Sequence, residues 1–238
     1  MNDLKVRRWT GAFGIAGFVV FLLALPLYFF VPQPITRLQD TVEFSDSVSR
    51  ASTFILTRAT LADPLIIACL LVFLAGFRHL IRQARPDYEW VGMLVFGAGL
   101  VMFTLGLAGD ALEGGAALDT YVKADPSVVR GLMEGSFAFY GAIGLIMSAL
   151  LLASAGYAIM TSGVLPRWTG WVAYAGAVVN LVAAPSIFGG TDYTGFYTAT
   201  GWVTFIGQAA VPIWFLIASV SLLTLKREAK AMTPVYGG

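Results

Sequence analysis

Four acidic residues border the long uncharged stretches of this 238-residue chain, and their types and spacing suit acid–base chemistry. Asp63, Asp110 and Glu134 each stand at the edge of such a stretch. Glu113 lies three residues beyond Asp110, on the same face of a helix. Carboxylates that lie close together can exchange protons with a substrate, or bind a metal ion or an organic cation. We therefore predict that Asp63, Asp110 and Glu134 are catalytic residues and that Glu113 binds a ligand.

A structural explanation of the same residues stays open. Asp63 has the pattern of a helix start, and Asp110 and Glu113 also mark a boundary with water. Arg130 lies four residues before Glu134, where the two side chains can pair. A cluster that faces an enclosed cavity would favour binding or catalysis, whereas one that faces water would favour a scaffold role.

Two amides, Asn180 and Gln208, lie within uncharged stretches at similar distances from their ends. We expect them at matching depth in neighbouring helices. They could join those helices by hydrogen bonds worth about 0.6 kcal/mol each, or orient a ligand. Tyr140 and Trp214 are further predicted ligand-binding residues, with packing between helices as the alternative.

Several kinds of site are excluded by composition. His79 is the only histidine and Cys69 the only cysteine, so a histidine-rich di-iron site, a bis-histidine haem and an intrachain disulfide are ruled out. The chain has no Gly-rich phosphate loop, no nucleophile elbow and no metalloprotease helix. The net charge of +1 offers no basic surface for nucleic acid. We predict no metal and no cofactor.

The uncharged stretches themselves define the class of protein. Hydrophobic residues make up 58% of the chain and charged residues 12%. A helix needs about 20 apolar residues to cross a bilayer core of roughly 30 Å. Five stretches are long enough and the sixth, Pro64–Phe77, needs its flanks. We predict an all-α integral membrane protein, a bundle of six transmembrane helices in a single domain 1–238, with helices at about 9–31, 60–81, 90–112, 132–160, 168–188 and 201–225.

Two connections on the predicted outer side carry helical signals. Apolar residues in the loop 32–59 recur at helical spacing, so we expect an interfacial helix there. Asp125 followed by Pro126 is typical of an N-cap and first helical position. The fourth helix would then begin before residue 132 and project beyond the bilayer.

Basic residues set the predicted orientation. Both termini are expected in the cytoplasm, and the protein is expected in a cell membrane, the bacterial inner membrane. Five basic residues then lie outside, namely Arg37, Arg50, Arg58, Lys123 and Arg130. Ten lie inside, namely Lys5, Arg7, Arg8, Arg78, Arg82, Arg85, Arg167, Lys226, Arg227 and Lys230.

A four-residue pattern occurs twice: Arg8-Trp9-Thr10-Gly11 returns as Arg167-Trp168-Thr169-Gly170. A parallel internal repeat and convergent use of the same interfacial anchors both explain it. With the long first outer loop and six helices, the chain resembles uncharacterised bacterial six-helix multipass membrane proteins of unknown function. The resemblance covers most of the chain and implies no functional residues.

Two functions remain as hypotheses. The first is a multipass protein that binds or moves a hydrophobic or cationic small molecule, or serves as a subunit of a membrane complex. The alternative is a cofactor-free membrane enzyme, with an outer-leaflet carboxylate site, acting on a lipid or isoprenoid-like substrate. The expected partners are membrane lipids, together with a small-molecule ligand, a second copy of the chain or another membrane subunit.

Overall fold

Helices make up all the regular secondary structure of the part of the chain that the computed structural model describes, residues 3–29, 40–121, 125–191 and 195–224. In chain order they are α1 (Asp3–Phe29), α2 (Thr41–Thr57), the π-helical turn η1 (Arg58–Ala62), α3 (Asp63–Ala84), the 3-10 turn η2 (Pro86–Tyr88), α4 (Glu89–Asp119), α5 (Pro126–Ala138), the π-helical turn η3 (Phe139–Ile143), α6 (Gly144–Ser162), α7 (Arg167–Ala183), the 3-10 turn η4 (Ala184–Gly189) and α8 (Trp202–Thr224).

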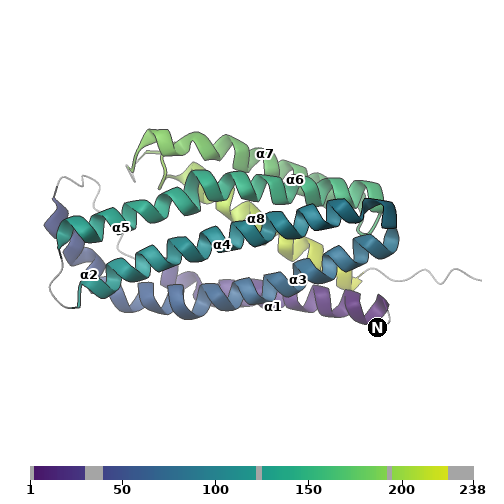
Figure 1. The fold of residues 1–238 in the computed structure, drawn as a ribbon, viewed down its shortest axis with the longest axis horizontal. Coiled ribbons are helices and arrows are strands. Elements are labelled where there is room, and N and C mark those ends of the chain that lie inside the picture. The colour runs from purple at the N-terminus through teal and green to yellow at the C-terminus, as the bar shows by residue number, and fades with distance from the viewer. Residues whose placement is uncertain (1–2, 30–39, 122–124, 192–194, 225–238) are drawn as a thin grey trace, which may run out of the picture.

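These elements join into six helical segments that are long and apolar enough to cross a membrane. The helices lie side by side in one bundle (Figure 1). The prediction of an all-helical chain with six such helices is confirmed for the described residues. The segments are Leu4–Tyr28, Thr41–Ala84, Pro86–Asp119, Pro126–Ser162, Arg167–Gly189 and Trp202–Thr224.

Several boundaries differ from the predicted ones because helical hydrogen bonding does not stop where an apolar stretch stops. The first helix begins at Asp3 rather than residue 9, and α4 continues to Asp119 rather than 112. Some predictions fall outside the described residues: the end of the first helix and start of the loop at 30–39, Lys123, residues 192–194 and the basic tail with Lys226, Arg227 and Lys230.

The predicted interfacial helix is part of a longer helix. Thr41–Thr57 continues through η1 into α3 without a break. The backbone N–H of Asp63 bonds to the carbonyl of Arg58, five residues back, which is one more than in an α-helix. Pro64, which has no backbone N–H to donate, follows directly after this turn.

The end of the bundle opposite to the start of α1 has a small core of its own. Here α2, the last turns of α4 and the start of α5 lie together (Figure 1). As expected, α5 begins at Pro126 with Asp125 as its N-cap. We call this region the α2–α5 end. Its buried apolar side chains are Phe44, Val48, Ala51, Ile55, Ala116, Ala117, Val129 and Met133.

Helix α8 crosses the bundle diagonally behind α4 and α6 (Figure 1). Near its C-terminal end it packs against α1 so closely that a Cβ on Gly14 would collide with Ser219. Near its N-terminal end it packs against α6 and α7 instead, and a Cβ on Gly207 would lie 2.8 Å from Leu145. Consequently α8 changes neighbours along its length.

Candidate functional site

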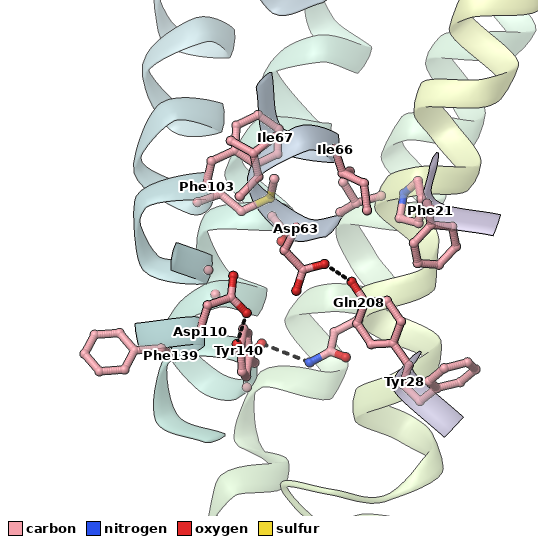
Figure 2. A pocket seen from close by; sticks show the side chains of 18 of the residues that line it. Phe21, Tyr28, Asp63, Ile66, Ile67, Phe103, Asp110, Phe139, Tyr140 and Gln208 are labelled. Carbon is pink, nitrogen blue, oxygen red and sulfur yellow. Dashed lines mark hydrogen bonds between the residues drawn. The ribbon is translucent and has the colours of Figure 1, made fainter. Parts of the chain in front are cut away.

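A cavity of about 480 Å³ lies between α1, α3, α4, α6 and α8, toward the α2–α5 end of the bundle. Figure 2 shows polar side chains converging on one part of it, with isoleucine and phenylalanine side chains above them. Its apolar lining includes Phe18, Phe21, Ile66, Ile67, Leu70, Met102, Phe103, Val211 and Phe215. Its polar lining includes Tyr28, Arg58, Asp63, Asp110, Glu113, Tyr140 and Gln208.

Arg58 is the centre of the polar part. It is only 6% exposed, and its guanidinium pairs with three carboxylates. Nε lies 3.4 Å from Asp63, and Nη2 lies 3.7 Å from Asp110 and donates a hydrogen bond to Glu113. With one guanidinium and three carboxylates, the ionised group would carry two negative charges in excess.

Each of the three carboxylates also accepts a hydrogen bond from a hydroxyl group. Tyr28 donates to Asp63, Tyr140 donates to Asp110 at 2.5 Å, and Ser136 donates to Glu113 at 2.9 Å. The ring of Tyr28 also lies under Arg58, with Cζ 5.1 Å from the ring centroid. These contacts hold six helical elements, α1, η1, α3, α4, α5 and η3, around one charge cluster.

Both π-helical turns lie at the cavity, and each places one of its polar residues. Arg58 is the first residue of η1, and Tyr140 belongs to η3. In η3, Gly141 has a ψ of −114°, outside the helical range. A Cβ on Gly144 would collide with the carbonyl oxygen of Phe139. Single π-turns within α-helices are frequent at functional sites because they rotate the following side chains.

The structure brings together five of the residues predicted from the sequence. They all line the cavity: Asp63, Asp110, Glu113, Tyr140 and Gln208. The amide nitrogen of Gln208 donates to the backbone carbonyl of Tyr140 at 3.3 Å, which ties α8 to η3. The acidic cluster therefore faces a cavity and not open water.

Glu134 does not join this cluster. Its carboxylate accepts a hydrogen bond from Nε of Arg130 at 2.8 Å, one helical turn away, and its side chain is 38% exposed. It does not line the cavity. The structural explanation, an i,i+4 pair with Arg130 on α5, fits its position.

Asn180 and Trp214 lie away from the cavity as well. The Asn180 amide nitrogen donates to the carbonyls of Gly176 and Gly207, at 2.9 and 3.0 Å, and so joins α7 to α8 next to Gln208. Trp214 is fully buried and packs edge-on against Phe73 and Phe77. Both belong to the packing between helices.

Arg58 and Tyr28 are site residues that the sequence analysis did not single out. Arg58 lies outside the uncharged stretches and counted only as one of the basic residues that set orientation. Its distance of five residues from Asp63 is not an α-helical i,i+4 spacing, and only the π-turn brings the two together. In the sequence, the signal that could have indicated Arg58 as a site residue was its position just before the apolar stretch Pro64–Phe77.

Within the described ranges, no group of three or more His, Cys, Asp or Glu side chains is arranged to hold a metal ion. A comparison of the chain with known protein families, characterised proteins and solved structures finds no match. The resemblance to bacterial six-helix multipass proteins therefore stays a prediction. The six apolar helices of the described residues suggest a membrane protein.

Proposed function

We propose that this chain is a six-span protein of a bacterial cell membrane that binds a hydrophobic organic cation in the cavity. The observation that carries the proposal is the cluster of three carboxylates around Arg58 at one end of an otherwise apolar cavity. The positive-inside pattern of the sequence supports an orientation with both termini in the cytoplasm and the α2–α5 end outside.

The charge of the cluster favours a cationic group. Taking charges out of water is costly unless each is paired and hydrogen-bonded. Arg58 compensates one of the three carboxylates, and the hydroxyls of Tyr28, Tyr140 and Ser136 supply only neutral donors. A bound cation would compensate a second carboxylate and would reduce the electrostatic cost of burying the cluster.

The apolar walls define the rest of the ligand. Small-molecule sites are typically of about 300–1,000 Å³, mostly apolar, with few polar groups that fix orientation. The volume of about 480 Å³ falls in this range. Phe103 and Phe215 line the cavity beyond the charge cluster. Their ring faces can contact hydrocarbon or, through the π-system, part of the positive charge.

Equilibrium binding of radiolabelled tetraphenylphosphonium to the protein in lipid nanodiscs tests this proposal. Binding above that of empty nanodiscs should saturate at one site. Asp110→Asn removes one charge but keeps an oxygen for the Tyr140 hydroxyl, so the fold should persist. We expect at least a tenfold weaker affinity, about 1.4 kcal/mol. The matched control is Glu134→Gln on α5, outside the cavity, which should bind as the unaltered protein does.

Two results would contradict the proposal: the absence of saturable binding, or equal affinities for Asp110→Asn and the unaltered protein. Thermal unfolding of each variant in the same nanodiscs checks that the bundle is intact.

A second candidate function rests on the hydrogen bond between Tyr140 and Asp110. Its length of 2.5 Å suits proton transfer, and both side chains line the cavity. The protein would then be a membrane enzyme acting on a lipid or isoprenoid-like substrate. Incubation with a bacterial lipid extract, followed by mass spectrometry, should reveal a product that is lost in Tyr140→Phe. An unchanged lipid profile would exclude this candidate for the lipids present.

A further inference from the structure

Helices α1 and α8 separate toward the α2–α5 end. Near the start of α1, Gly11 and Gly14 pack directly on Ser219 and Leu223 of α8. Farther along, Gly17 of α1 packs on α3, where a Cβ would lie 3.1 Å from Leu70. The outer part of α1 thus follows α3.

The outer part of α8 follows α6 and α7. The carbonyl of Gly207 is bonded to Asn180 on α7, and a Cβ on Gly176 of α7 would lie 3.5 Å from Ala210. Because the two helices take different neighbours, a wedge opens between them. The cavity lies in this wedge, since its lining includes Phe21 of α1 together with Gln208 of α8 (Figure 2).

The exposed part of the cavity lining lies on α8, at this wedge. Phe205 is 49% exposed and Gln208 is also exposed, whereas Arg58 and Glu113 at the charge cluster are buried. With the helices placed in a bilayer, the side of the bundle between α1 and α8 faces lipid. The described residues thus leave the cavity open toward the hydrocarbon of the outer half of the bilayer.

A polar atom without a partner also points to an occupant. The hydroxyl oxygen of Thr200 is buried, lines the cavity and has no hydrogen-bond partner among the described residues. Buried polar groups are normally paired. A hydroxyl oxygen can turn its lone pairs toward a positive charge, so this atom suits a cationic group in the cavity.

From this geometry we infer that the occupant is a membrane-borne amphiphile, with a cationic head at the carboxylates and a hydrocarbon tail between α1 and α8, taken from the outer leaflet of the bilayer. This inference rests on the proposed function, which requires only a hydrophobic cation. The head lies against Asp63 and Asp110, and the tail contacts Phe21 and the outer half of α8. Such a ligand need not leave the hydrocarbon to reach the site.

The inference can be tested by photolabelling the protein in phosphatidylcholine vesicles. The probe is a dodecyltrimethylammonium analogue with a diazirine in its chain, and labelled peptides are located by mass spectrometry. We expect labels within residues 18–28 of α1 and 205–215 of α8. Excess dodecyltrimethylammonium should abolish the labelling. A hundredfold excess of tetramethylammonium, the head group alone, should leave it unchanged.

Two glycines of α4 supply a matched pair of variants. A Cβ on either Gly106 or Gly97 would meet no neighbouring atom within 4 Å, so a larger side chain can begin at both positions without a collision. Gly106 lines the cavity and Gly97 does not. Gly106→Leu should fill the cavity and lower labelling at least tenfold, while Gly97→Leu should not change it.

The outcomes separate the inference from the proposed function. If tetramethylammonium competes as well as the dodecyl compound, the site takes its cation without the tail; the inference then fails while the proposed function stands. Equal labelling of Gly106→Leu and Gly97→Leu, or labels spread over all lipid-facing helices, also overturns the inference. If neither the dodecyl probe nor tetraphenylphosphonium binds saturably, both the inference and the proposed function fail.

Discussion

Replacing Arg58 by methionine removes the positive charge that pairs with three carboxylates, without a large change in side-chain length. Breaking a buried ion pair by removing one partner typically costs 3–5 kcal/mol. Arg58 is 6% exposed, pairs directly with Glu113 and lies over Tyr28, a cation–π contact that adds about 0.5–2 kcal/mol. We expect Arg58→Met to lower the free energy of unfolding by about 4 kcal/mol, roughly a thousandfold in the unfolding equilibrium.

A double-mutant cycle with Glu113→Gln provides the assay. Glutamine keeps an acceptor for Ser136, so the second change removes mainly the charge. Unfolding free energies of the four proteins are measured by steric trapping in bicelles. The double variant should be more stable than Arg58→Met alone, with a coupling energy of about 2–3 kcal/mol.

The matched control for this cycle is Arg130→Met, whose partner Glu134 is partly exposed. Exposed pairs contribute about 1 kcal/mol or less. If Arg58→Met costs no more than Arg130→Met, or if the changes at Arg58 and Glu113 are strictly additive, the buried network does not stabilise the fold as argued.

Two other predictions concern the edges of the site. A Cβ on Gly109 would lie 2.7 Å from the ring of Tyr140, so Gly109→Ala should displace the tyrosine from Asp110. We expect tetraphenylphosphonium binding to weaken about tenfold. Unchanged binding would show that the Tyr140–Asp110 hydrogen bond is not needed for binding. The Ser127 hydroxyl and backbone N–H, which donate to Asp125, hold the pKa of this N-cap below its ordinary range. Because the folded-state pKa is lowered, protection of the first α5 amides from hydrogen exchange should be constant above about pH 4 and fall at lower pH, whereas Asp125→Asn should show no such fall.

The helices were predictable because their signal is local. A bilayer requires a run of apolar residues, and such runs can be counted in the sequence. The start of α5 was predictable for the same reason, since Asp125 caps its own helix two residues away. The joining of α2 and α3 into one helix was not predictable from the sequence. It depends on the π-helical turn before Pro64 and on the packing of Phe44 and Val48 against residues of α4 and α5.

The candidate site was predictable in part. Asp110, Glu113 and Asp63 stood out because carboxylates at the edges of apolar stretches are rare and costly. Glu134 has the same local pattern, yet it faces Arg130 rather than the cavity. Arg130, four residues before Glu134, indicated this pair as an alternative, but whether Glu134 faces the cavity depends on how α5 packs against the other helices.

By itself the sequence determined the class of secondary structure, the number of apolar helices and the acidic residues that border them, because each of these depends on residues close together in the chain. The tertiary structure alone decided that Arg58 lies among three carboxylates, one on its own helical segment and two on α4, and that α1 and α8 separate to open a cavity beside them. The cavity brings together residues as far apart in the chain as Tyr28 and Gln208, and this arrangement arises only from the crossing and packing of whole helices.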